Sequence, residues 1–227
     1  MTKDELEAII IQQLNQISEI KTYVEIWTNL CQKFQPDEKY RDVYEWSPYF
    51  WQVVLENFQD RFLMETAKLF DDDRNCRSID KLIKTCEQNH QLFPDQHIRK
   101  LHNSQSGETI TLKVPVNLPE TIRIAQEKYN ATSETRKKLK MLRDKHLAHS
   151  EKKYYVQPRI LYKEVSLSHE DFQNLVTVAG EIANSFLCAL TDSVVCLKHQ
   201  DVDDYIRLLD FAHDGIESYH LKWKTNS

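Results

Sequence analysis

The chain has 227 residues, a formal net charge of −5, 29% charged and 41% hydrophobic residues, and only three glycines and six prolines. A chain of this length can form a core without disulfides or metals, and so few turn-forming residues argue against a sheet-rich fold and favour long helices. The acidic balance excludes nucleic-acid binding over the whole surface, but it does not exclude a local basic patch.

The five cysteines indicate a reducing, cytoplasmic location. They are odd in number, dispersed and never arranged as CxxC, which argues against a disulfide framework or a zinc finger. The N-terminal segment starts with acidic residues and has no signal-cleavage pattern, and no apolar run approaches the roughly 18 to 20 residues of a membrane span. We therefore expect a cytoplasmic protein with no membrane partner.

Apolar residues at three- and four-residue steps predict a series of helices in the first hundred residues. Pro36 ends the first helix, Ser47 and Pro48 begin the second, Ser78 caps the third, and Pro94 opens the fourth. The predicted ranges are 3–34, 48–71, about 78–88 and about 94–101.

The segment 103–118 interrupts this helical pattern. It is polar and ends in the alternating run TITLKV, which predicts an insertion with a small hairpin. Helix resumes at Pro119 and extends to about Ala148, with a break expected in NATSE, where cap-type residues cluster. After an irregular connection, the last predicted helices cover about 168–197, begun by a capping box, and about 201–222.

These elements predict one all-α domain over 1–227, with its insertion at about 103–118. No internal repeat, low-complexity tract or convincing linker divides the sequence. The simplest interpretation is a single helical bundle.

Positive charge is concentrated near the end of the helix predicted to reach residue 148. Between residues 134 and 159, nine basic residues oppose three acidic ones, a net charge of +6 that leaves −11 for the rest of the chain. Such a patch attracts polyanions, although lysines at a solvated helix end also complement the helix dipole. Leu139, Leu142, Arg143, His146 and His149 share an arc of about 120° on the helical wheel, so a phosphate could meet all three polar groups.

The run RDKHLAH, from Arg143 to His149, resembles the signature of the HEPN superfamily. In that signature, an arginine is followed by a polar residue, and four to six residues separate the arginine from a histidine. Five residues separate them here. The fuller RDKHLAHS, with the upstream METAKLFDDDRNCRSIDKLI, is similar to the AbiU-like branch, named after the abortive-infection protein of type U. The similarity covers roughly residues 46–190. It implies an HEPN-like antiparallel bundle of about five helices that forms a homodimer, often a metal-independent endoribonuclease.

The resemblance implies catalytic roles for Arg143, His149 and Asp144. RNA cleavage without a metal needs a base for the 2′-hydroxyl, an acid for the leaving 5′-oxygen and a fixed cation for the phosphorane charge. His149 would transfer protons, Arg143 would bind the phosphate, and Asp144 would orient one of them. Because in-line attack places base and acid on opposite sides, two protomers facing each other across a cleft would supply both.

Further contacts with RNA are expected around this motif. The candidate substrate-binding residues are Lys145, His146, Ser150, Lys152, Lys153 and Tyr154. His146 also fits a core histidine, and Tyr154 or Tyr155 also fit packing positions at a helix exit. No metal or cofactor is expected: the ligand-type residues Cys86, His90, His97 and His102 match no zinc spacing.

Three hypotheses follow for the function. The first is a ribonuclease of toxin–antitoxin or phage-defence type, restrained by a partner that for HEPN toxins is often a nucleotidyltransferase-type antitoxin. The second is a non-catalytic HEPN-type module that binds RNA or protein through the basic patch. The third is a structural scaffold in which Arg143 closes a buried ion pair with Asp71 or Asp144.

Overall fold

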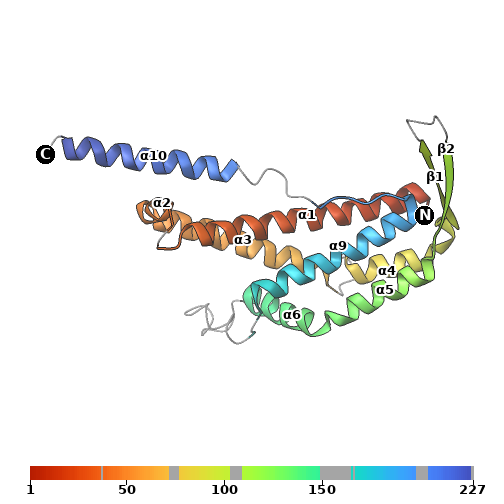
Figure 1. The fold of residues 1–227 in the computed structure, drawn as a ribbon. Coiled ribbons are helices and arrows are strands. Elements are labelled where there is room, and N and C mark those ends of the chain that lie inside the picture. Colours follow the sequence, from red (N-terminus) through yellow and green to blue (C-terminus); the bar gives the residue numbers. More distant parts are fainter. Residues whose placement is uncertain are drawn as a thin grey trace. The chain divides into compact units, whose positions relative to one another are not determined.

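The structure, a computed structural model, describes residues 1–36, 38–71, 77–102, 109–148, 165, 167–197 and 204–225. Within these ranges the chain is helical apart from one hairpin (Figure 1). The helices are α1 (Lys3–Lys33), α2 (Arg41–Trp46), α3 (Pro48–Leu69), α4 (Ile79–Gln88), α5 (Leu118–Ala131), α6 (Ser133–Ala148), α9 (His169–Thr191), α10 (Asp204–Thr225) and the short 3₁₀ helix η1 (His90–Leu92). The hairpin consists of β1 (Gln96–His102) and β2 (Thr109–Pro115). The predicted all-α class with a hairpin insertion is confirmed.

Local capping explains why several helices begin where the sequence predicts. The Asn117 side chain accepts a hydrogen bond from the Glu120 backbone N–H at the start of α5. At α9, Ser168 and Asp171 form a reciprocal capping box, with distances of 3.1 and 2.8 Å. The break predicted in NATSE falls at Thr132, whose hydroxyl donates to the Tyr129 carbonyl at 2.7 Å. These signals are local, so they can be recognised in the sequence.

The predicted helix over 94–101 is wrong, because Gln96–His102 forms strand β1. It pairs antiparallel with β2, with Leu101 opposite Ile110. The hairpin is also anchored to the end of α9: the His97 Nε2 atom lies 3.0 Å from the Ala189 carbonyl oxygen, and Arg99 forms a salt bridge with Asp192. Pairing and anchoring of this kind outweigh a local helix preference.

The structure also corrects two helix assignments. The short helix α2 was not predicted, and α9 ends at Thr191 rather than near residue 197. Asp192 terminates α9 in the left-handed conformation, with φ of 62°. The following residues return along the helix, where the Asn184 side chain exchanges two hydrogen bonds with the Val195 backbone, at 2.9 and 3.1 Å. A Cβ atom on Gly180 would lie 2.6 Å from the Leu197 Cδ1 atom, so the glycine lets the returning chain pack closely against α9 without moving this side chain.

Contacts between residues divide the chain into two compact units. Unit 1 comprises residues 1–17 and 66–197, and unit 2 comprises residues 18–65 and 198–227. Helices α1 and α3 each contribute residues to both units. A single domain over 1–227 therefore stays a prediction.

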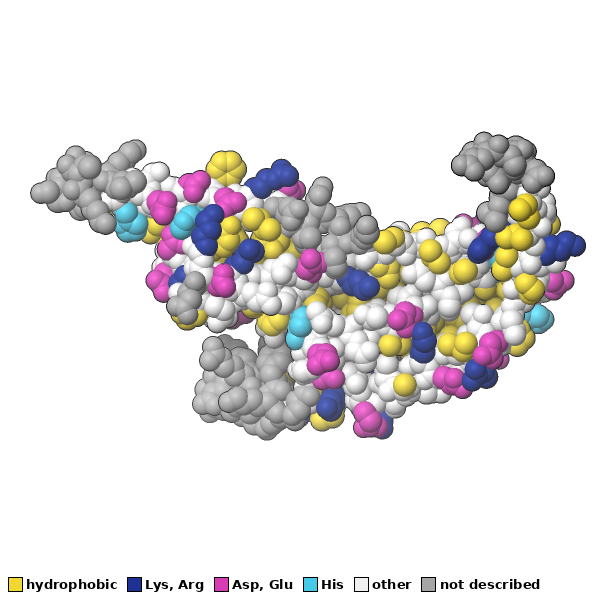
Figure 2. All heavy atoms as spheres, in the orientation of Figure 1, with side chains coloured by type: hydrophobic (Ala, Val, Ile, Leu, Met, Phe, Trp, Pro, Cys, Tyr) yellow, Lys and Arg dark blue, Asp and Glu magenta, His cyan; other side chains and the backbone are white. Residues whose placement is uncertain are grey.

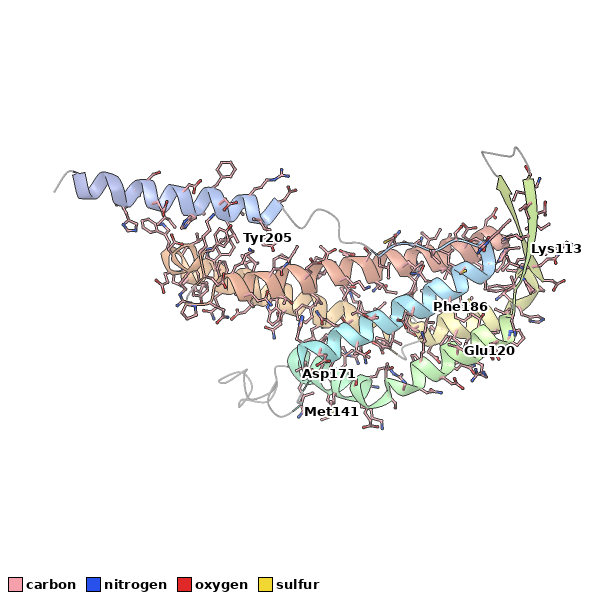
Figure 3. The ribbon with its side chains drawn as sticks, in the orientation of Figure 1. Lys113, Glu120, Met141, Asp171, Phe186 and Tyr205 are labelled. Atoms are coloured by element: carbon pink, nitrogen blue, oxygen red, sulfur yellow. The ribbon has the colours of Figure 1, made fainter. Side chains whose placement is uncertain are left out.

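Helix α9 is the central helix of unit 1, where it contacts α4, α5 and α6. Eleven of its 23 residues are buried, and Phe186, labelled on α9 in Figure 3, is fully buried. By length and composition α9 could cross a membrane, a property that the sequence prediction overlooked. A core helix passes the same test, and the burial of its apolar side chains within unit 1 identifies α9 as one.

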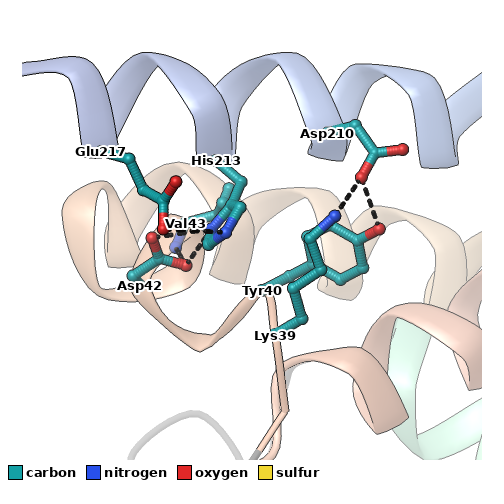
Figure 4. Close-up of polar contacts among 7 residues, drawn as sticks. All are labelled: Lys39, Tyr40, Asp42, Val43, Asp210, His213 and Glu217. Atoms are coloured by element: carbon teal, nitrogen blue, oxygen red, sulfur yellow. Dashed lines mark hydrogen bonds and ion pairs between the residues drawn. The ribbon is translucent and has the colours of Figure 1, made fainter.

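Unit 2 is built around an aromatic core. The buried members of this cluster are Leu30, Phe34, Tyr40, Val43, Trp51, Leu209 and Ile216, which come from α1, the following turn, α2, α3 and α10. The Phe34 and Trp51 rings lie 5.1 Å apart, centroid to centroid. Polar contacts between α10 and the α2 region complete the unit (Figure 4): Asp210 accepts hydrogen bonds from Lys39 at 2.6 Å and from the Tyr40 hydroxyl at 2.8 Å.

Candidate functional site

The best-defined part of the candidate site is an ion-paired arginine on the last turns of α6. The Arg143 guanidinium donates to Asp144, with Nε–Oδ1 at 2.9 Å and Nη2–Oδ1 at 2.8 Å. Its Nη1 atom also donates to Asp71, which follows α3. The structure therefore joins the predicted arginine and aspartate of the motif to a carboxylate that follows a different helix.

Arg143 and Asp71 are shielded from solvent to similar extents, whereas Asp144 is open. The exposed fractions of their side chains are 17%, 19% and 53%. Burial by itself would lower the pKa of Arg143, but the hydrogen bonds and charges of Asp144 and Asp71 outweigh it and raise the pKa above the ordinary value. Arg143 is thus a permanent, fixed positive charge.

A small notch beside Arg143 contains more positive than negative charge. It is lined by Ala67, Phe70, Asp71, Arg136, Leu139, Lys140 and Arg143. Three cations therefore face one carboxylate, and an anion is the charge that this notch favours. Its volume of about 20 Å³ accommodates roughly one water molecule.

Arg136 forms part of this wall, although the sequence analysis counted it only as one of the nine basic residues of the patch and gave it no individual role. Its guanidinium lies 3.7 Å from the centre of the Tyr129 ring, and its Nε atom donates to the Thr132 hydroxyl at 3.2 Å. Tyr129 in turn stacks on Phe70, with ring centres 6.2 Å apart. The signals in the sequence were the basic patch and the four-residue step from Thr132 to Arg136, because the ring contacts join segments far apart in the chain.

Two leucines hold the motif helix in place. Leu139 and Leu142 are buried, whereas Met141 between them is 49% exposed. Figure 3 shows Met141 of α6 and Asp171 of α9 at the same end of unit 1. The leucine seam predicted from the helical wheel therefore faces the core, and Arg143 lies at its margin.

The remaining predicted residues are placed only in part. Lys145 is half-buried on α6, and His146 lies on the same helix. The residues that fall outside the described part of the chain are His149, Ser150, Lys152, Lys153 and Tyr154. Their proposed roles stay predictions.

Among the described residues, no group of three or more histidine, cysteine, aspartate or glutamate side chains could hold a metal ion. Two of the residues considered above for zinc, His97 and Cys86, have other surroundings. His97 is hydrogen-bonded to the Ala189 carbonyl, and burial raises the pKa of the Cys86 thiol to about 12. A thiol with this pKa stays protonated at neutral pH and is a poor ligand.

The helical fold and the Arg143-Asp144 pair at the end of α6, in the setting of the RDKHLAH run, define a protein of the HEPN class. The family model HEPN_AbiU2, with the description AbiU2, matches residues 3–214, so the chain belongs to the AbiU2 family of HEPN proteins. It is an abortive-infection-related HEPN module, as the sequence predicted. No curated protein and no solved structure matches the chain.

Proposed function

We propose that this protein is a metal-independent endoribonuclease of toxin–antitoxin or phage-defence type, whose composite site forms across a homodimer. The observation that carries the proposal is the fixed Arg143 cation at the end of α6, held by Asp71 and Asp144 beside an anion-favouring notch. The AbiU2 membership supports the same function. The protein would act on RNA in the cytoplasm.

The geometry suits Arg143 to bind a phosphate without losing its position. A guanidinium has five N–H donors, and the contacts with Asp71 and Asp144 involve Nε, Nη1 and Nη2, or three of the five. The remaining donors can meet a phosphoryl oxygen while the ion pairs hold the side chain. Such a preorganised cation stabilises charge that builds up on phosphorus during 2′-hydroxyl attack.

His149 would supply the proton transfers, and Lys145, Lys152 and Lys153 would follow the RNA backbone. His146, Ser150 and Tyr154 would contact the nucleotides flanking the cleaved bond. A single notch of about 20 Å³ is too small to hold a nucleotide, which agrees with a site completed by a second protomer. We further propose restraint by a partner, for which a nucleotidyltransferase-type antitoxin is the candidate.

The test is incubation of the purified protein with total RNA in excess chelator, followed by analysis of the product ends. Wild type should leave 2′,3′-cyclic phosphate or 3′-phosphate ends, and the Arg143→Ala/His149→Ala double variant should not. The matched control is Arg123→Ala/His90→Ala, which removes the same side-chain types from the surface of α5 and from η1. Cleavage that persists in the double variant would refute the assignment.

A second candidate function is a non-catalytic RNA- or protein-binding module. The observation that favours it is the double pairing of Arg143, because two carboxylates offset the guanidinium charge and so weaken the stabilisation that it could give to a phosphorane. It predicts salt-dependent RNA binding without product formation. Chelator-resistant cleavage that requires Arg143 and His149 would exclude it.

A further inference from the structure

Unit 2 contains an apolar pocket remote in sequence from the motif helix. It has a volume of about 390 Å³ and lies between α2, the beginning of α3 and α10. Its lining includes Val43, Trp46, Trp51, Phe211, Ile216 and Tyr219. The Trp46 and Tyr219 rings meet edge to face, with centres 5.4 Å apart. This volume lies within the range of ligand-binding pockets, and four of these six lining residues are aromatic.

Three of the four aromatic side chains of this pocket are unusually open, and the fourth, Trp51, is buried. Phe211 is 78% exposed and Trp46 is 54% exposed, although each could bury apolar area on folding. Phe50, in the first turn of α3, extends the exposed aromatic surface, and its ring meets that of Trp51 edge to face with centres 5.1 Å apart. Clustered exposed aromatics of this kind mark interaction surfaces, and buried aromatic anchors dominate binding energies there.

The charges around the pocket are predominantly acidic. Every charged residue of α10 between Arg207 and Lys222 is an acid, and these acids are Asp210, Asp214 and Glu217. The facing helix α2 adds Asp42 and Glu45. Figure 2 shows acidic and hydrophobic side chains next to one another along α10.

The cations near the pocket offset only part of this negative charge. Lys39 forms a salt bridge with Asp210, and Arg41 forms one with Glu45. Lys33 also lies over the Tyr40 ring, 5.1 Å from its centre. Counting these three cations against the five acids gives a net charge of −2 around the pocket, histidines not counted. A positively charged occupant is therefore favoured.

A histidine fixes the two walls of the pocket to each other. The His213 Nδ1 atom lies 3.0 Å from Asp42 Oδ2, and its Nε2 atom lies 3.7 Å from Glu217 (Figure 4). Together with the Asp210 contacts to Lys39 and Tyr40, this holds α10 against the α2 region. A preformed pocket binds more tightly than one that must be ordered on binding.

We propose that this pocket binds a basic amphipathic segment of a partner protein. The apolar side chains of the partner segment enter between Trp46, Phe211 and Tyr219. The lysines or arginines of that segment meet the acidic residues around the pocket and the faces of the aromatic rings. A second copy of this chain fits less well, because an isologous contact would bring two acidic rims together. The inference does not depend on RNA cleavage.

The experiment measures binding of a synthetic Leu/Lys amphipathic helical peptide to the full-length protein by fluorescence anisotropy. A matched peptide carries glutamate in place of every lysine. The lysine peptide should bind, the glutamate peptide should bind at least tenfold more weakly, and Phe211→Ala should weaken the lysine peptide about tenfold. Asp214→Asn/Glu217→Gln should weaken it too, and less so at high salt. The matched control Tyr49→Ala, which removes an exposed aromatic that does not line the pocket, should bind as wild type does.

Phe211 is so exposed that its loss should leave the fold intact, which circular dichroism checks. Equal binding of the two peptides, or equal losses in Phe211→Ala and Tyr49→Ala, would overturn the proposal. Sedimentation of wild type and Phe211→Glu tests whether a second copy of this chain occupies the pocket instead. A drop in assembly mass in the variant would make this face a contact between copies of the chain and would overturn the proposal as well.

Discussion

The Arg143 guanidinium pairs with the Asp71 carboxylate across 72 residues of chain, and the two side chains are almost equally shielded, at 17% and 19% exposed. This pair ties the end of α3 to the motif helix α6. Breaking it leaves a partly buried charge without its partner, whereas the more exposed Asp144 contact is screened by water. The two carboxylates should therefore differ in their contribution to stability.

Asp71→Ala should lower the free energy of unfolding by about 1–3 kcal/mol, because the charge of Arg143 remains shielded. Asp144→Ala should cost no more than about 1 kcal/mol, since its side chain is 53% exposed. Urea unfolding followed by circular dichroism measures both. Equal losses in the two variants would contradict the assigned difference in burial.

The leucine seam of α6 gives a second prediction. Leu139→Ala should destabilise the protein by about 2–5 kcal/mol, because it removes a buried side chain and leaves a cavity. Met141→Ala, two residues further along the same helix, should change stability by less than about 0.5 kcal/mol, since Met141 faces solvent. Denaturant midpoints distinguish the two, and a large loss in Met141→Ala would indicate that this surface is covered by another chain.

The charge of α6 gives a prediction for RNA binding. Lys140→Gln removes one cation of the notch. The slope of log affinity against log salt is negative, and this change should make it shallower by roughly 0.7, the value for one phosphate contact with a single strand. Arg123→Gln on α5 should leave the slope unchanged, because Arg123 is paired with Glu120 and Glu127. Filter binding at several salt concentrations measures the slopes, and identical shifts would show binding spread over the whole surface.

The contact between hairpin and α9 gives a pH-dependent prediction. The hydrogen bond from Arg99 holds the pKa of Asp192 below its ordinary value of 3.8. A depressed carboxylate pKa stabilises the folded state above pH 3.8, and this contribution is lost as pH falls through the lower, folded-state pKa. Wild type should therefore exceed Asp192→Asn in stability at neutral pH, and the difference should shrink on acidification.

Asparagine is the informative substitution at this position because it tolerates the left-handed conformation that Asp192 adopts. Asp192→Ala loses the ion pair and adds backbone strain, so it should be less stable than Asp192→Asn at neutral pH. Thermal unfolding from pH 7 to pH 3 measures the whole series. A pH-independent difference between wild type and Asp192→Asn would exclude the ion pair as its source.

Elements with local start and stop signals could be predicted from the sequence. The capping box at Ser168, the Pro48 start of α3 and the break at Thr132 all depend on neighbouring residues. The hairpin strand β1 could not be predicted from the sequence, because its structure depends on pairing with β2 and on contacts to Ala189 and Asp192. The early end of α9 has a similar cause, since Asn184 hydrogen-bonds to a residue eleven positions later.

The same limit applies to the candidate site. The motif spacing located Arg143 and Asp144 side by side on one helix, and the ion pair with Asp71 was one of the alternatives considered. The ring contacts around Arg136 join α5, α6 and the end of α3, so no periodicity in the sequence indicated them. The apolar pocket of unit 2 was also missed, because its walls come from segments more than 150 residues apart.

Helices α1 and α3 each belong to both compact units. Unit 2 takes its residues from 18–65 and from 198–227, so neither unit is one continuous stretch of chain. A gene fragment that encodes one unit alone would have to stop inside a helix and join two distant pieces of sequence. The two walls of the aromatic pocket flank the motif helix in the sequence, so a single crossover between relatives cannot exchange the motif helix and leave both walls in place.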